Sequence, residues 1–171
     1  MIARSSFRGC LVGALLGDCL GAAFEGNPLS SDDGALVLQL RVRKHVLKAF
    51  SDADKAGSQL DYTDDTAMLR SVALSLVHCK AFDPHDMAMR FSETCFSDKP
   101  RAYGGHIRAV FEAIRTGGKD KKGRSALKDV YKPARAQFDG SGSYGNGGAM
   151  RVAPVALFHA DSLQDTLKVY S

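Results

Sequence analysis

Residues 62–79 read Tyr-Thr-Asp-Asp-Thr-Ala-Met-Leu-Arg-Ser-Val-Ala-Leu-Ser-Leu-Val-His-Cys, and this stretch predicts a helix with a charged beginning. Thr63 stands where a helix N-cap is expected, and the two aspartates after it would lie in the first turn, where the helix dipole favours negative charge. Apolar residues then recur at helical spacing, at Ala67, Met68, Val72, Leu76 and Cys79. We therefore expect a helix over residues 64–79.

Asp64 and Asp65 leave two interpretations open. Adjacent carboxylates behind the hydroxyl of Thr63 are hard oxygen ligands, which select Mg²⁺, Ca²⁺ or Mn²⁺ over zinc. The same residues are also what an ordinary capped helix start contains. This stretch alone does not decide between a metal site and a helix start.

A second stretch, residues 140–151, contains five glycines and is followed by the apolar residues 152–158. Glycines let backbone N–H groups approach an anion closely, which is how phosphates are cradled. A mobile surface loop has the same composition. The stretch contains no Walker or dinucleotide-binding fingerprint, so the loop alone is a weak signal of phosphate binding.

Together with the amino-terminal segment, these stretches resemble the ADP-ribosylglycohydrolases. The similarity runs in register from about residue 6 to the end of the chain. Among the family, the chain resembles vertebrate members that remove ADP-ribose from serine and degrade poly(ADP-ribose). The similarity is carried by residues 7–19, by Phe24 and Glu25, and by residues 62–66, 133–138 and 142–151.

The resemblance implies an all-α fold, an orthogonal helical domain, and a catalytic centre with two Mg²⁺ ions. Glu25 matches a mobile glutamate needed for turnover, and Glu25, Thr63, Asp64 and Asp65 match metal ligands. Asp18 lies in an apolar helix, where an unpaired carboxylate is costly, so we expect it to form hydrogen bonds, either to residues that hold the metal or in a purely structural role. The residues that match the substrate-binding positions are Asp64, Ser141, Gly142, Ser143, Tyr144, Gly145, Asn146 and Gly147.

Members of the family are longer than this chain of 171 residues. We therefore expect residues 1–171 to be the amino-terminal part of a single domain, truncated at the carboxyl end. The missing half would supply a second metal motif and further adenine contacts. On this expectation the chain alone has little activity, and its apolar residues Leu15, Met68, Val72, Phe91 and Val155 are partly uncovered.

Further helices are expected near residues 7–24, 84–96, 104–116 and 163–170, with a surface loop at residues 116–125. Residues 27–58 are ambiguous: Leu36, Leu38, Leu40 and Val42 alternate as in a strand, whereas Leu36, Leu40, Leu47 and Phe50 suit a helix. The resemblance favours helix or coil there.

The net charge is +4 and the sequence pI is near 8.9, which suits an anionic substrate. Two basic stretches carry most of the excess, and neither contains the interleaved aromatic residues of a strand-stacking surface. We expect a solvated helix face and an exposed loop, with no direct nucleic-acid binding. The stretches contain Arg41, Arg43, Lys44, His45 and Lys48, and Lys119, Lys121, Lys122, Arg124 and Lys128.

The amino-terminal helix carries Gly9, Gly13, Gly17 and Gly21 at four-residue spacing, which predicts a face that a neighbouring helix approaches closely. Its apolar run is short and contains Asp18, so a helix of a soluble protein is favoured over a membrane span or a secretory signal. The four cysteines form no C-x-x-C pair, and we expect them to be reduced and mostly buried.

The functional expectation is Mg²⁺-dependent hydrolysis of serine-linked ADP-ribose and poly(ADP-ribose) by a monomer. Hydrolysis of arginine-linked ADP-ribose and an inactive, truncated ADP-ribose binder are the alternatives. The resemblance implies ADP-ribosylated proteins and poly(ADP-ribose) as partners. It also implies the nucleus, the cytoplasm and the mitochondrial matrix as compartments.

Overall fold

The computed structural model describes residues 4–25, 35–52, 55, 60–97, 100–141, 143 and 145–160. Over these residues the chain forms helices and one isolated bridge between Lys119 and Ser125, and no strand, as the all-α expectation requires. The helices are α1 (Arg4–Gly21), α2 (Ala35–Asp52), α3 (Asp64–Cys79), α4 (Pro84–Ser97), α5 (Gly105–Thr116), α6 (Lys132–Arg135) and α7 (Ala153–Phe158). Three short 3₁₀ turns are η1 (Ala22–Phe24), η2 (Gln137–Gly140) and η3 (Ala149–Arg151).

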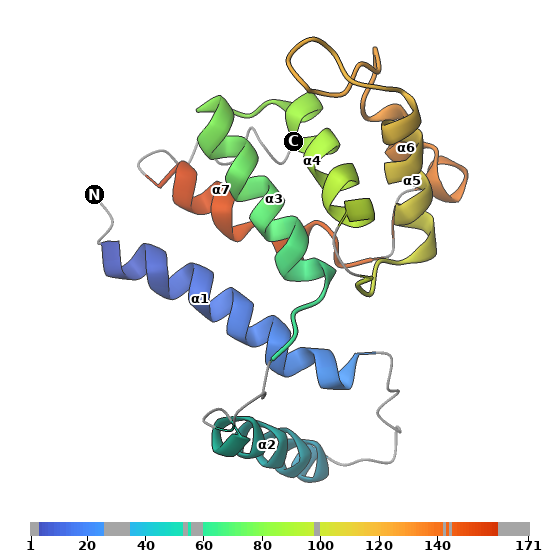
Figure 1. The fold of residues 1–171 in the computed structure, drawn as a ribbon. Helices are drawn as coiled ribbons and strands as arrows, with labels where there is room; N and C mark the ends of the chain where they lie inside the picture. Colours follow the sequence, from blue (N-terminus) through green and yellow to red (C-terminus); the bar gives the residue numbers. More distant parts are fainter. Residues whose placement is uncertain are drawn as a thin grey trace.

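Helix α3 is the central helix and has the predicted bounds. Its N-cap is Thr63, whose side chain accepts a hydrogen bond from the Asp65 N–H at 3.2 Å. It ends at Lys80, which adopts the left-handed conformation with φ of 54°. Figure 1 shows α3 between α1 on one side and α4 on the other, with α7 alongside.

The core lies where α3, α4, α5 and α7 meet. Met68, Val72 and Leu76 of α3 are at most 2% exposed, and they pack with Phe91 of α4 and Phe111 of α5. Helix α4 begins after Asp83, whose carboxylate accepts hydrogen bonds from the N–H groups of its second and third residues, His85 and Asp86. The sequence therefore encodes this part of the fold through apolar spacing and capping.

The expectation that Met68, Val72, Phe91 and Val155 are partly uncovered is wrong. All four are buried where α3, α4, α5 and α7 pack against one another. The expectation is correct for Leu15, which is 37% exposed beside Leu11, Val12 and Leu16 on α1. Helix α2 also exposes apolar residues.

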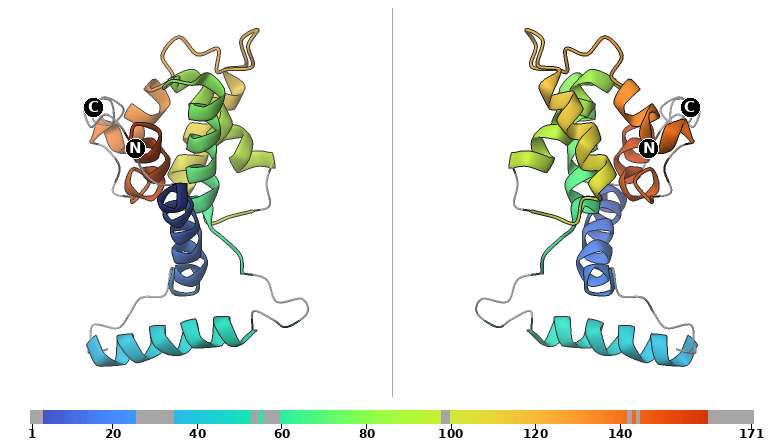
Figure 2. Two further views of the ribbon diagram at one scale, coloured as in Figure 1. Left: turned by 90° about the vertical axis from the view of Figure 1, so that its left-hand side faces the viewer. Right: turned by 90° about the vertical axis from the view of Figure 1, so that its right-hand side faces the viewer.

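Helices α1 and α2 form the edge of the molecule. Figure 2 shows α1 extending from the bundle, with α2 lying across its far end. The helical alternative for residues 36–50 is correct. The predicted close approach to the glycine face of α1 is not made by any described residue, since a Cβ at Gly9, Gly13, Gly17 or Gly21 would meet nothing within 4 Å.

By length and composition, residues 4–24 form a helix long and apolar enough to cross a membrane. Such a segment near the amino terminus is weak support for a span, because soluble core helices and signal sequences have the same composition. Cys19 and Cys95 are buried, Cys79 is partly buried, Cys10 is exposed, and all four are free thiols. The helix predicted over residues 163–170 lies outside the described residues, as does most of the link between α1 and α2.

Candidate functional site

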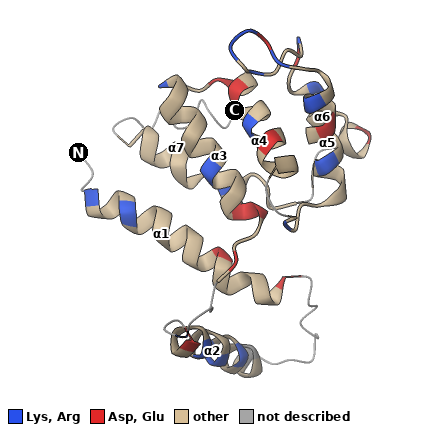
Figure 3. Cartoon of the chain, in the orientation of Figure 1, with Lys and Arg blue, Asp and Glu red and all other residues tan. Residues whose placement is uncertain are grey.

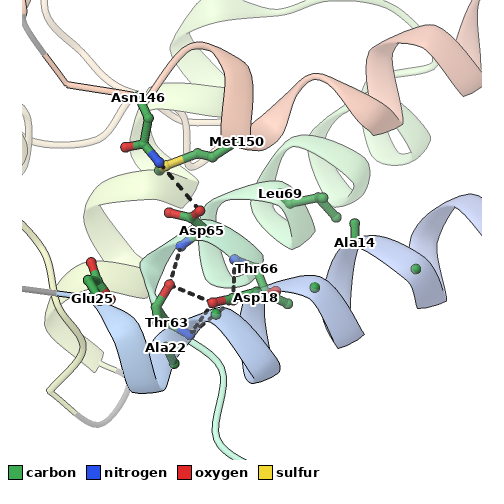
Figure 4. Close-up of a pocket in the computed structure, with 13 residues that line it drawn as sticks. Ala14, Asp18, Ala22, Glu25, Thr63, Asp65, Thr66, Leu69, Asn146 and Met150 are labelled. Atoms are coloured by element: carbon green, nitrogen blue, oxygen red, sulfur yellow. Dashed lines mark hydrogen bonds between the residues drawn. The ribbon is translucent and has the colours of Figure 1, made fainter. Parts of the chain in front are cut away.

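A cavity of about 420 Å³ opens between α1, the beginning of α3 and the glycine-rich loop. Figure 4 shows Asp18 and Ala22 rising from the α1 side, Thr63 and Asp65 from the start of α3, and Asn146 and Met150 from the loop. Glu25 lies at one end of the same cavity. The cavity therefore brings together residues from the three sequence blocks that carry the predicted site.

Asp18 fixes the start of α3 onto α1. Its carboxylate accepts hydrogen bonds from the Thr63 N–H at 3.0 and 3.2 Å, from the Thr63 hydroxyl at 2.8 Å and from the Thr66 N–H at 3.1 Å. The Thr63 hydroxyl is thus used twice, because it also accepts from the Asp65 N–H. The prediction that Asp18 forms hydrogen bonds is confirmed, and its partners include Thr63, one of the predicted metal ligands.

Asp64 and Asp65 point to different surroundings. Asp65 lines the cavity, and the amide of Asn146 approaches its Oδ2 at 3.5 Å, which links the glycine-rich loop to α3. Asp64 is only 9% exposed and does not line the cavity. Both aspartates therefore lie in the first turn of α3, but only Asp65 lines the cavity.

Glu25 follows the short turn η1 at the end of α1. Its N–H donates to the Ala22 carbonyl at 3.3 Å, and its backbone is extended, so the turn ends there. The residue is exposed at the rim of the cavity. This position is open enough for the carboxylate to meet a ligand held below it.

The site is electrostatically unfavourable for carboxylates. Burial, followed by repulsion from Asp64, Asp65 and Asp18, raises the pKa of Glu25 above its ordinary value. Burial and like charge also raise the pKa of Asp65, and burial raises that of Asp64. Among the residues that the structure describes, none of these carboxylates pairs with a lysine or arginine.

The donor chemistry of the cavity fits a hard divalent cation, because its polar walls supply carboxylate, hydroxyl and amide oxygens that no basic side chain neutralises. The geometry is less complete. Within the described residues, no three or more His, Cys, Asp or Glu side chains form a group tight enough to hold a metal ion. The predicted metal ligands Glu25, Thr63, Asp64 and Asp65 therefore lie in one region, but their side chains do not converge on a single position for a metal ion.

The glycine-rich loop is placed only in part. Asn146 lines the cavity, and its carbonyl accepts from the N–H groups of Ala149 and Met150, which starts η3. Ser141, Ser143, Gly145 and Gly147 do not line the cavity, and the Gly145 N–H donates to the Ser143 hydroxyl at 3.1 Å. Gly142 and Tyr144 lie outside the described residues.

The sequence did not reveal how Tyr62 is held. Arg101, in the link between α4 and α5, lies 3.5 Å from the centroid of the Tyr62 ring, and its guanidinium donates a hydrogen bond to the Tyr62 carbonyl. The partners are 39 residues apart, and no local pattern signals such a contact. Arg101 thereby supports the residue that precedes Thr63.

Comparison with known proteins agrees with this arrangement of blocks. A sequence model described as ADP-ribosylglycohydrolase matches residues 1–170. The ADP-ribosylhydrolase ARH3 of Mus musculus and that of Homo sapiens are each 45% identical to the chain over 168 residues, which is 96% of this chain and 41% and 42% of those proteins. The ARH3 of Danio rerio is 46% identical over 154 residues, covering 90% of this chain and 37% of that protein.

The chain thus spans about two-fifths of the length of these curated relatives. The match extends over almost the whole chain and includes α1, the capped start of α3 and the glycine-rich loop, which together build the cavity. The chain belongs to the ADP-ribosylglycohydrolase family.

Proposed function

We propose that the protein to which these residues belong is a Mg²⁺-dependent hydrolase that releases ADP-ribose from serine-linked adducts and degrades poly(ADP-ribose). The observation that carries the proposal is the cavity in which Glu25, Asp65 and Asn146 meet, each from a different block shared with the family. The names of the relatives, ADP-ribosylhydrolase ARH3, support the activity. The serine linkage, the polymer and the choice of Mg²⁺ are the proposed details.

Cleavage of a glycosidic bond passes through a transition state resembling an oxocarbenium ion, so it needs a carboxylate that handles protons. Glu25 suits this role because partial desolvation of its carboxylate and its acidic neighbours raise its pKa above that of an ordinary glutamate. Its exposed position at the rim of the cavity lets it reach a ribose bound inside. We assign Glu25 as the catalytic residue.

Thr63, Asp64 and Asp65, together with Glu25, are the residues that would hold the metal. Bound Mg²⁺ would orient the ribose hydroxyls and an attacking water. Asp18 keeps the Thr63 backbone and the first turn of α3 in place, so the aspartates are presented from a rigid helix end. Asn146 holds the loop against Asp65.

The loop residues Ser141, Gly142, Ser143, Tyr144, Gly145, Asn146 and Gly147 are proposed to surround the diphosphate and ribose. Ser141, Ser143 and Gly145 are exposed, so they can turn toward a ligand without leaving a packed core. The Gly145 N–H would exchange its bond to Ser143 for a phosphate oxygen. This exchange costs little, since one hydrogen bond replaces another.

One observation favours a second candidate, an ADP-ribose binder without activity. No group of metal-binding side chains is complete within the part of the chain that the structure describes. Half of a ligand set holds Mg²⁺ weakly, because the remaining positions are filled by water. If the protein is an enzyme, the alternative activity is hydrolysis of arginine-linked ADP-ribose.

The proposal includes action as a monomer on ADP-ribosylated proteins in the nucleus, cytoplasm and mitochondrial matrix, without direct contact with nucleic acid or a membrane. The test compares this chain with a version completed by the remaining residues of a relative. Both are assayed with Mg²⁺ on serine-linked and arginine-linked ADP-ribosyl peptides and on poly(ADP-ribose). Release from serine and polymer by the completed protein supports the proposal, and release from arginine alone, or no release, contradicts it.

A further inference from the structure

Helix α2 contacts α1 and the residue Phe24 that ends η1. The ring of His45 meets the ring of Phe24 edge-on, with centroids 5.2 Å apart, and Val46 and Ala49 are partly buried on the same side. Because Phe24 immediately precedes Glu25, this contact places α2 beside the catalytic end of the cavity. Figure 2 shows α2 lying apart from the bundle of α3, α4, α5 and α7.

The outward surface of α2 is apolar and basic at the same time. Leu36, Leu40, Leu47 and Phe50 are 56–70% exposed, with Phe50 at 70%. Arg43 is seven residues from both Leu36 and Phe50, so these three lie on nearly one line along the helix. We call the surface formed by Leu36, Leu40, Arg43, Lys44, Leu47 and Phe50 the α2 face.

The charges of the α2 face are not neutralised by the protein. Lys48 pairs with Asp52 at 2.8 Å, but neither Arg43 nor Lys44 has an ion-pair partner among the described residues. Both are exposed. Figure 3 shows α2, with its basic residues in blue, at the end of the molecule opposite the loop that links α5 to α6. A solvated helix face explains the cations, but not four large apolar side chains left in water beside them.

We propose that the α2 face is an auxiliary binding surface for poly(ADP-ribose), which holds the chain whose terminal unit occupies the cavity. This inference rests on the proposed function. Each unit of the polymer carries a diphosphate and an adenine, which match a pair of free cations and an exposed aromatic ring with apolar neighbours. The contact between His45 and Phe24, on the opposite side of α2, holds the helix beside the Glu25 end of the cavity.

The test uses the 171-residue chain and two probes, ADP-ribose and poly(ADP-ribose) of defined length. Dissociation constants are measured at several salt concentrations by titration calorimetry and fluorescence anisotropy. The variant R43Q/K44Q removes both free cations of the α2 face. The matched control K121Q/K122Q removes two exposed lysines from the loop at the opposite end of the molecule. Circular dichroism establishes that each variant is folded.

For R43Q/K44Q we expect polymer binding to weaken about tenfold or more at low salt, and the slope of log Kd against log salt to fall by about 2. Phe50→Ala should weaken polymer binding about fivefold or more with the salt slope unchanged. Binding of ADP-ribose should stay the same in every variant, and K121Q/K122Q should bind both probes as the wild type does.

Equal polymer binding by R43Q/K44Q and the wild type, or equal weakening by the control, would overturn the proposal. So would polymer binding no tighter than that of ADP-ribose. Tighter binding of single-stranded RNA or of phosphatidylserine vesicles, lost in R43Q/K44Q, would assign the α2 face to those partners instead. If ADP-ribose does not bind but polymer binding still depends on Arg43 and Lys44, the result supports polymer binding by the α2 face and contradicts the proposed catalytic site.

Discussion

Asp18 and Thr63 are 45 residues apart in the sequence, yet the Asp18 carboxylate accepts hydrogen bonds from both the backbone N–H and the hydroxyl of Thr63. The same carboxylate accepts from the Thr66 N–H. One half-buried acid thus joins α1 to the N-terminus of α3 and satisfies donors that a helix start leaves free. The relative positions of Glu25 and Asp65 depend on this connection.

Asp18→Asn tests the connection. The amide keeps one acceptor oxygen but places an NH₂ group against backbone donors, so the free energy of unfolding should fall by about 1 to 3 kcal/mol. Urea denaturation measures this loss. Asp139→Asn, the same change at an exposed residue of η2, should alter stability by less than about 0.5 kcal/mol. Equal stability of Asp18→Asn and the wild type would mean that the connection contributes nothing.

Asp65→Asn should stabilise the metal-free protein. Burial and the charges of Asp64 and Asp18 disfavour the Asp65 carboxylate, as its raised pKa indicates, and the amide removes that repulsion. We expect a rise in Tm of about 1 to 3 °C without divalent cations. Added Mg²⁺ should raise the Tm of the wild type but not of the variant. A lower metal-free Tm would show that the charge serves mainly as a helix-dipole partner.

Arg101 and Tyr62 should be energetically coupled. Arg101→Lys keeps the charge but loses the planar contact with the ring, which costs about 1 kcal/mol. Tyr62→Leu removes the ring. In a double-mutant cycle the two losses should not add, because each single change already destroys the contact. If the two losses in stability add, Arg101 does not support the start of α3 through the Tyr62 ring.

Asp83 gives a prediction about pH. Burial acts to raise the pKa of Asp83, but hydrogen bonds from Arg124 and from the N–H groups of Asp86 and His85 outweigh it and hold the pKa below its ordinary value. The folded protein then binds fewer protons at this group than the unfolded chain. The resulting stability is present above a pH of about 4 and is lost as the pH falls through the lowered pKa.

The variant Asp83→Ala loses both the helix cap and the contact with Arg124 and should cost about 1 to 2 kcal/mol at pH 7. Asp83→Asn retains the capping oxygen and should cost less. The difference between the wild type and each variant should shrink as the pH falls below about 4. Urea midpoints at pH 7 and pH 3 measure this, and a difference that grows in acid would reverse the assigned sign.

The parts of the fold that follow from local sequence were predictable. Thr63 and the apolar spacing after it predict α3 with its observed ends, and Asp83 followed by Pro84 predicts the start of α4. Residues 36–50 were not decided, because their apolar spacing fits a strand and a helix alike. The burial of Met68 and Phe91 depends on how four helices pack, which no single stretch contains.

Of the residues predicted for the site, Glu25, Thr63, Asp65 and Asn146 line the cavity, and the geometry of the cavity was not predictable from the sequence. Asp18 stands out as a carboxylate in an apolar helix, so a hydrogen-bonding role follows from desolvation alone. That its partners are Thr63 and Thr66 depends on the crossing of α1 and α3. Similarly, the sequence predicts that Asp64 and Asp65 bind a metal together, yet the geometry of the helix directs only Asp65 into the cavity.

The central claim is that the cavity between α1, α3 and the glycine-rich loop binds ADP-ribose with a divalent cation. Titration calorimetry of ADP-ribose into this chain, with and without Mg²⁺, tests it most directly. We predict that Mg²⁺ tightens ADP-ribose binding in the wild type, that Asp65→Asn loses this tightening, and that Glu25→Gln, which removes one proposed metal ligand, weakens the tightening but still binds ADP-ribose. ADP-ribose binding that is the same with and without Mg²⁺, and the same in Asp65→Asn, would contradict the claim.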